Sequence, residues 1–154
     1  MLNQDFKEFI QSLNANNVRY LVIGGYAVAF HGDPRYTKEL DVWVEPTPEN
    51  AARGIKALEQ FGFASLGFKA EDFFAPDVVI QLGLPPSRID ILPSAEGVDF
   101  DTCYTSRVQV VIGGVPANFI DLENLKKNKR AAGRLQDLQI WRTCNSGMHS
   151  WHGG

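Results

Sequence analysis

The amino-acid sequence predicts an α/β domain in which helices flank a mixed central β-sheet. Short runs of β-branched and aromatic residues, such as 18–23 and 39–44, alternate with segments whose apolar residues recur at helical spacing, such as 4–14. Residues 107–120 predict a hairpin that turns over a Gly-Gly pair. Because a hairpin is antiparallel and the helices and strands do not alternate regularly, we expect a mixed sheet and not a uniform parallel one.

Local signals predict where the individual helices and strands begin and end. Thr47 is a good N-cap and Pro48 a good first helical residue, so a helix is expected from there to about Phe61, before Gly62. Further strands are expected at 62–67, 77–84 and 88–93; a short helix is expected at 26–32, a short helix or loop at 98–107, and one or two helices from 121 onwards.

Length and composition limit the kind of protein this is. The 154 residues suit one domain, which we expect at 1–145, with a flexible tail at 146–154. A formal net charge of −3 argues against general affinity for nucleic acid. The longest apolar stretch, 20–30, is too short to span a bilayer, and the N-terminus has no signal-peptide core, so no membrane partner and a cytoplasmic location are expected.

Three carboxylates and a Gly-Gly pair indicate a metal and nucleotide site. Strand alternation puts Glu39 and Asp41 on one face, where two like charges repel and resist burial. Asp90 lies in the middle of another expected strand, and Gly24-Gly25 end the strand before them with backbone N–H groups free to face an anion. Such oxygen ligands suit Mg²⁺ (or Mn²⁺) with the phosphates of a nucleotide. Without metal, one of the three carboxylates should have a raised pKa.

Several residues have simpler explanations that the sequence leaves open. Asp90 could form a salt bridge with Arg88 or Arg35 instead of binding metal. His31 is expected to be a locally hydrogen-bonded residue at a helix end. The remaining side chains expected to have no catalytic role are the tail histidines His149 and His152 and the thiols Cys103 and Cys144.

A basic cluster follows Asp121 and has two readings. It comprises Lys126, Lys127, Lys129, Arg130 and Arg134. On a helix these residues would form a solvated face, or they would line the active cleft and meet phosphates or an RNA acceptor. Asp137 is expected to pair with Arg134 or Arg130.

The stretch GGYAVAFHGDPRYTKELDVWV resembles the start of minimal nucleotidyltransferases of the DNA-polymerase-β-like superfamily. Their pattern is Gly-Gly or Gly-Ser, a spacer, and Asp-x-Asp. The resemblance extends to RIDIL, the third acidic strand, and to the helical DLENLKKNKRAAGRLQDLQ, which is similar to the ending of bacterial members, some from abortive-infection and toxin–antitoxin systems. It covers most of residues 18–142. One position departs from the pattern, because residue 39 is Glu where the family usually has Asp.

The resemblance implies transfer of a nucleoside monophosphate from ATP or another NTP to a hydroxyl on a protein, RNA or small molecule. Glu39 and Asp41 would hold the metal on the triphosphate, and Asp90 would join them on a second metal. Gly24 and Gly25 would let the backbone approach the phosphates. The resemblance does not fix the roles of the flanking Arg35 and Lys38, which could neutralise phosphate charge.

Glu39 supports an alternative function for the same fold. Its extra methylene moves the carboxylate by about one C–C bond length, and Mg²⁺ demands near-ideal octahedral geometry. The alternative is therefore a degraded nucleotidyltransferase fold that binds a partner as an antitoxin or regulator. In either case the small size suggests that a partner protein or a homodimer completes the site.

Overall fold

The described strands form one mixed six-stranded sheet. The computed structural model describes residues 3–32, 39–63, 66–84 and 86–143, with the backbone alone for 134–143. The strand order is β3-β4-β2-β1-β6-β5. Their bounds are β1 (Tyr20–Ile23), β2 (Glu39–Val44), β3 (Ile80–Leu82), β4 (Arg88–Leu92), β5 (Val108–Ile112) and β6 (Val115–Phe119).

Antiparallel and parallel pairings are both present. β1 pairs antiparallel with β2, as β3 does with β4 and β5 with β6. β1 is parallel to β6, and β2 is parallel to β4. The described sheet is therefore mixed and is flanked by helices, which confirms the predicted α/β architecture.

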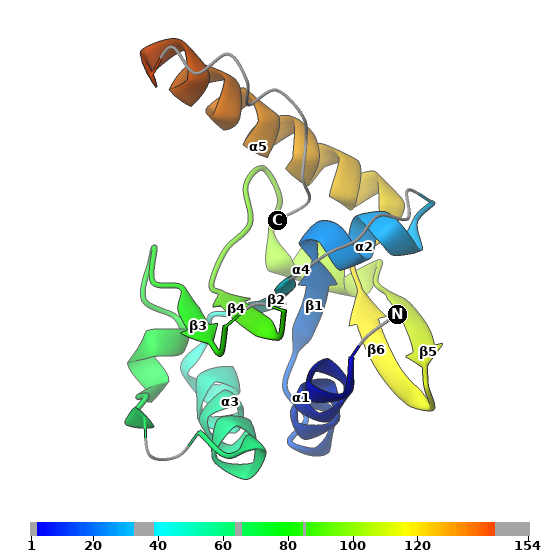
Figure 1. Ribbon diagram of the computed structural model, residues 1–154, viewed down its shortest axis with the longest axis vertical. Coiled ribbons are helices and arrows are strands. Elements are labelled where there is room, and N and C mark those ends of the chain that lie inside the picture. The colour runs from blue at the N-terminus through cyan, green and yellow to red at the C-terminus, as the bar shows by residue number, and fades with distance from the viewer. Residues whose placement is uncertain (1–2, 33–38, 64–65, 85, 144–154) are drawn as a thin grey trace.

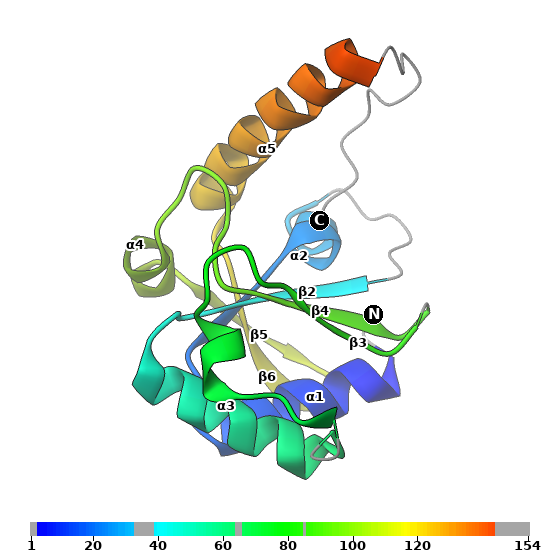
Figure 2. The ribbon, with the colours of Figure 1, turned by 90° about the vertical axis from the view of Figure 1, so that its left-hand side faces the viewer.

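The helices lie on both faces of the sheet. In Figure 2, α1 (Gln4–Ala15) and α3 (Pro48–Phe61) lie below it, while α2 (Gly24–Phe30) and α5 (Leu122–Thr143) lie above. The short α4 (Phe100–Thr105) lies at one end, and the 3-10 helix η2 (Ala70–Phe73) follows α3. Figure 1 shows the far half of α5 projecting from the body of the molecule.

Apolar residues facing α1 and α3 form the core beneath the site. On β2 and β4 the side chains of Leu40, Val42, Ile89 and Ile91 are at most 2% exposed. Because side chains alternate along a strand, the residues between them face α2 and α5. Burial of this apolar layer fixes which face receives the charged residues, since a slip of one residue would reverse both faces.

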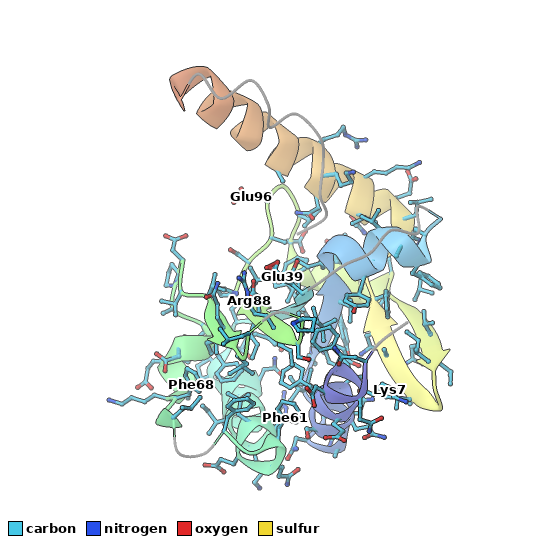
Figure 3. The ribbon with its side chains drawn as sticks, in the orientation of Figure 1. Lys7, Glu39, Phe61, Phe68, Arg88 and Glu96 are labelled. Carbon is cyan, nitrogen blue, oxygen red and sulfur yellow. The ribbon has the colours of Figure 1, made fainter. Side chains whose placement is uncertain are left out.

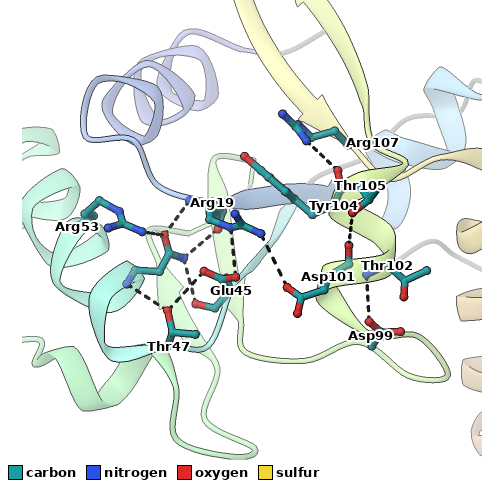
Figure 4. A network of polar contacts seen from close by, with 11 residues as sticks. Arg19, Glu45, Thr47, Arg53, Asp99, Asp101, Thr102, Tyr104, Thr105 and Arg107 are labelled. Carbon is teal, nitrogen blue, oxygen red and sulfur yellow. Dashed lines mark hydrogen bonds and ion pairs between the residues drawn. The ribbon is translucent and has the colours of Figure 1, made fainter.

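A polar network holds the end of the sheet opposite the candidate site (Figure 4). The buried Asn50 side chain accepts from the Arg19 backbone N–H at 2.8 Å and donates to the carbonyls of Arg19 and Glu45 at 2.9 and 3.0 Å. The Arg19 side chain pairs with Glu45 at 3.2 Å and with Asp101 at 3.8 Å. These contacts join β1, β2, α3 and α4, which stabilises the pairing of β1 with β2.

Most predicted elements are confirmed, including the Thr47 cap and Pro48 start of α3 and the hairpin of β5 and β6. The strand expected at 62–67 is wrong: Gly62 takes a left-handed conformation that ends α3, and no strand occurs at the described positions of this segment. The strand expected at 77–84 is limited to β3. Residues from Leu122 form one helix.

The expectations at α2 need two corrections. The helix begins at Gly24, two residues earlier than predicted, so Gly24 and Gly25 belong to its first turn. His31 caps its C-terminus but bonds to the distant carbonyl of Ile120, with Nε2 at 2.8 Å, and not locally. The tail from 144 onwards lies outside the described residues. Within the described ranges, none of the helices has both the length and the apolar character that crossing a bilayer requires.

Replacement of Gly54 by alanine should destabilise the protein although it removes a glycine from a helix. An added Cβ would lie 2.6 Å from Cε2 of Phe73, so α3 and η2 would have to separate. Overpacking should cost about 1–3 kcal/mol, against the usual gain of about 0.5–1 kcal/mol from glycine to alanine, so we expect a net loss of up to about 2 kcal/mol in the free energy of unfolding. Urea unfolding measures the difference.

Gly133→Ala is the matched control, because no described atom lies within 4 Å of its added Cβ. This change should leave stability unchanged or raise it by up to about 1 kcal/mol. Equal effects of the two substitutions would contradict the proposed packing of α3 on η2.

Candidate active site

Three carboxylates meet on the face of the sheet that carries α2 and α5. In β2 and β4, Glu39 lies opposite Arg88 and Asp41 lies opposite Asp90. One oxygen from each of Glu39, Asp41 and Asp90 lies within 4.8 Å of the others. Asp41 and Asp90 are only 5% and 7% exposed. We call Glu39, Asp41 and Asp90 the carboxylate cluster; the structure brings together the three acidic residues predicted from the sequence.

Among the described residues, Arg88 is the cation that contacts this cluster. Its Nε donates to Asp90 Oδ1 at 3.0 Å, and its Nη2 donates to Asp90 Oδ2 at 2.9 Å. The same Nη2 lies 2.8 Å from Glu39 Oε2. Figure 3 shows Glu39 and Arg88 next to each other above the sheet. The salt bridge between Arg88 and Asp90, which the sequence left open as an alternative to metal binding, is thus present, and these carboxylates raise the pKa of Arg88.

Asp41 is the carboxylate that Arg88 does not reach. No hydrogen bond or ion pair of its side chain is found within the described part of the chain. Burial, and then the negative charges of Asp90 and Glu39, raise the pKa of Asp41 from 3.8 to about 7, against the opposing effect of Arg88. The prediction of one raised pKa in the cluster is confirmed. A buried carboxylate that has no partner in the described part of the chain, together with two neighbouring carboxylates, forms a donor set that fits a hard divalent cation.

Gly24 leaves the space that the Asp41 side chain occupies. Ile23, the last residue of β1, lies opposite Asp41, so the chain turns into α2 directly over this carboxylate. A Cβ on Gly24 would overlap Asp41 Oδ2 and lie 3.1 Å from Asp41 Cγ. Gly24 also has a φ of +69°, which favours glycine. Gly24 therefore accommodates the Asp41 carboxylate; the predicted role of the Gly-Gly pair toward phosphate stays a prediction.

A cavity of about 370 Å³ opens beside the cluster. Asp41 and Asp90 form part of its wall, and Asn128 and Ala132 of α5 form another part. Asn128 Nδ2 donates to the carbonyl of Glu96 at 2.9 Å, which joins α5 to the loop after β4. The described wall also includes Asp77 and Glu96, but no lysine or arginine. The cavity is therefore acidic.

The acidic wall corrects one reading of the basic cluster. Lys126, Lys127 and Arg130 are exposed on α5, and none of them is part of the described cavity wall. Since Asn128 and Ala132 face the cavity, the helical period places Lys126 and Arg130 on the opposite side of α5. Lys126 lies 3.6 Å from Glu123. These residues form a solvated face, which is the simpler of the two readings.

Some predicted residues lie outside the described part. They are Arg35, Lys38, Cys144, His149 and His152, together with the side chains of Arg134 and Asp137. Cys103 is buried, and burial raises the pKa of its thiol to about 11, as expected for a side chain that packs and does not react.

The prediction of site residues did not include Arg88 or Asn128. Arg88 could have been found, because strand alternation puts it on the same face as Asp90, two residues away. Asn128 had no comparable signal, since its position depends on how α5 crosses the sheet.

Comparisons with known proteins support the fold. No protein-family model and no curated protein matches the sequence significantly. The structure is similar to the crystal structure of a protein from Thermotoga maritima that is provisionally named a nucleotidyltransferase. The TM-score is 0.64 at 15% sequence identity, and the match covers 90% of this chain and 88% of the other. At this identity the similarity establishes a nucleotidyltransferase-like fold and leaves the activity to be argued from the site.

The raised pKa of Asp41 predicts that metal-free protein loses stability as the pH rises. The folded state keeps the Asp41 proton up to about pH 7, whereas the unfolded chain releases it near 3.8. Between these values the unfolded state binds fewer protons, so the free energy of unfolding should fall by up to about 4 kcal/mol. Asp41→Asn removes this titration. Urea unfolding of both proteins should show that the stability of the variant relative to wild type rises by about 2–3 kcal/mol from pH 5 to pH 8. A difference that does not change with pH would contradict the raised pKa.

Gly24→Ala should destabilise the protein more than an alanine at a comparable left-handed glycine. The matched control is Gly67→Ala, because Gly67 has a φ of +72° and no described atom within 4 Å of its added Cβ. Both changes introduce backbone strain of about 1–2 kcal/mol, but only Gly24→Ala displaces the Asp41 carboxylate, at a further cost of about 1–3 kcal/mol. Chemical denaturation of the two variants measures this difference. Equal losses would show that Gly24 does not constrain Asp41.

Proposed function

We propose that this protein is a metal-dependent nucleotidyltransferase. It transfers a nucleoside monophosphate from ATP or another NTP to an acceptor hydroxyl and releases pyrophosphate. The observation that carries the proposal is the carboxylate cluster: three carboxylates from neighbouring strands converge at a cavity, and one of them is buried with no partner among the described residues. The nucleotidyltransferase-like fold of the Thermotoga maritima protein supports it.

The residues of the cluster would have different roles. Divalent cations held by these oxygens would neutralise phosphate charge and favour ionisation of the acceptor hydroxyl. Glu39 and Asp41 would bind on the side of the triphosphate, and Asp90 on the side of the acceptor. The backbone at Gly24 and Gly25 borders the cluster, so it would lie close to the phosphates.

The proposal also gives a role to Arg35 and Lys38, two cations that lie shortly before Glu39 in the sequence. Because the described cavity wall has no lysine or arginine, the charge of a triphosphate has to be balanced by metal and by residues from other segments. Arg35 and Lys38 directly precede β2, where the cluster begins, and we assign them this role.

A second candidate function is a binding module without transfer activity. Two observations favour it: residue 39 is Glu in place of Asp, and Arg88 is paired with two of the three carboxylates. In this case the surface would bind a partner as an antitoxin or regulator. Replacement of the carboxylates would then leave partner binding intact.

We further propose that residues 1–145 act as one domain whose acceptor side is completed by a partner protein or a second copy. The projecting part of α5 supports this arrangement, because it extends beyond the sheet that carries the cluster (Figures 1 and 2). The acceptor hydroxyl would then belong to a protein, an RNA or a small molecule held at this side.

Thermal unfolding with ligands tests the proposed function. Wild-type protein should be heated alone, with Mg²⁺ or Mn²⁺, with each NTP, and with both together. A ligand at a hundred times its Kd adds about 2.7 kcal/mol, which moves the midpoint of a domain of this size by several degrees. We expect a shift that requires both metal and nucleotide. Asp41→Asn and Asp90→Asn should abolish this shift and nucleotidyl transfer.

The control is Asp77→Asn, which makes the same chemical change in the cavity wall outside the carboxylate cluster. It should preserve the metal-dependent shift. A shift that survives Asp41→Asn, or no shift with any nucleotide, would favour the binding module.

A further inference from the structure

Arg88 occupies a place in the cluster that the proposed mechanism does not use. Its guanidinium contacts Glu39 and Asp90, the first and third carboxylates of the cluster, but not Asp41. We propose that Arg88 is a positioning residue: it is the internal counter-ion of the metal-free cluster, and a divalent metal ion displaces it from Glu39 on binding.

The contact of Arg88 with Asp90 is stronger than its contact with Glu39. Asp90 is held by two hydrogen bonds in the planar fork geometry that an arginine forms with a carboxylate, at 3.0 and 2.9 Å. Glu39 is held by Nη2 alone, at 2.8 Å, and this nitrogen is shared with Asp90. The contact with Glu39 is therefore the one that opens more easily.

The solvent exposure of the two carboxylates also indicates that the contact with Glu39 opens more easily. The Glu39 side chain is 35% exposed, whereas the Asp90 side chain is 10% exposed. Glu39 also has one more rotatable bond than an aspartate and lies at the start of β2, so it can turn from Arg88 toward a metal. Asp90 is fixed two residues from Arg88 on the same strand face, and each of its oxygens keeps a second lone pair.

Arg88 and a divalent metal ion would compete because both compensate the negative charge of the carboxylate cluster. Without Arg88 the cluster would place three carboxylates together with no cation among the described contacts. A divalent ion would provide the same compensation more strongly, because it carries two charges. To bind, the divalent ion would also have to coordinate an oxygen of Glu39 that is already paired with Arg88. Arg88 thus stabilises the metal-free protein and weakens metal binding.

This inference rests on the proposed function in one respect, that the cluster binds a divalent metal. The test is calorimetric titration with Mn²⁺, without nucleotide, of wild type, Arg88→Met and the control Arg107→Met. Arg107 also carries one positive charge; it stacks on Tyr104 at 4.0 Å and has no carboxylate partner in the described residues. We expect Arg88→Met to lower the Kd for Mn²⁺ about tenfold and Arg107→Met to leave it unchanged.

Thermal unfolding separates this role from that of an ordinary salt bridge. Arg88→Met should lower the midpoint of the metal-free protein by several degrees, and saturating Mn²⁺ should remove most of the difference from wild type. An ordinary salt bridge would lower the midpoint equally with and without Mn²⁺ and leave the Kd unchanged. Arg88→Lys keeps the charge but lacks the planar fork, so its Kd should lie between those of wild type and Arg88→Met.

Wild-type protein provides a measurement that does not depend on the folding of a variant. On titration with Mg²⁺, the carboxyl carbon resonance of Glu39 should shift, while the Nε–H resonance of Arg88 should stay protected by its bond to Asp90. Loss of that protection, or no shift at Glu39, would overturn the inference. If wild type binds Mn²⁺ and Arg88→Met binds it no more tightly, this inference fails alone. If neither protein binds Mn²⁺, both this inference and the proposed metal site are wrong.

Discussion

Repulsion among three carboxylates, two of them in the interior of a sheet, is the constraint around which this end of the molecule is arranged. A buried charge is costly unless it is paired, hydrogen-bonded or neutralised. The cluster shows pairing and neutralisation, and a neighbouring glycine provides the space that one carboxylate needs. Arg88 pairs with Glu39 and Asp90, Asp41 takes up a proton near neutral pH, and Gly24 gives up its side chain to leave space for Asp41.

The same constraint explains the relation between stability and binding at this site. A cluster that is costly without a cation will accept one readily, so the unfavourable energy of the metal-free state becomes part of the affinity for metal. Arg88 limits this effect by compensating two of the three charges in advance. If the cluster binds metal as proposed, the protein would therefore fold before metal is bound, at the expense of some affinity.

Strand alternation and turn residues were sufficient to predict most of the sheet and the strand face on which each of the three carboxylates lies. Glu39 and Asp41 could be placed on one face from their spacing, and Asp90 from the apolar residues on either side of it. The pairing of β2 with β4 could not be predicted in this way, because about fifty residues separate the two strands and periodicity contains no information about which strands are neighbours. The family resemblance supplied that link.

One predicted strand was wrong because of a local chain conformation, and one open question about α5 depends on a contact between distant segments. Residues 62–67 have a strand-like composition, but the left-handed Gly62 ends α3 there. The basic residues of α5 were candidates for the cleft, yet the side of α5 that faces the cavity depends on its contact with the loop after β4. In that contact Asn128 bonds to Glu96, and Gly97 packs against Ala131. Side-chain spacing along α5 cannot reveal this contact, because the loop lies some thirty residues earlier.

The first half of α5 is anchored to the rest of the molecule, since Asn124 and Leu125 are buried and Asn128 and Ala132 line the cavity. The 22 residues of the helix span about 33 Å, and the contact at Asn128 and Ala132 lies near the halfway point. A helix transmits a tilt along its length without bending much. A force applied to the projecting end would therefore move the cavity wall at Asn128 and Ala132, and change the width of the cavity without any contact with the carboxylates.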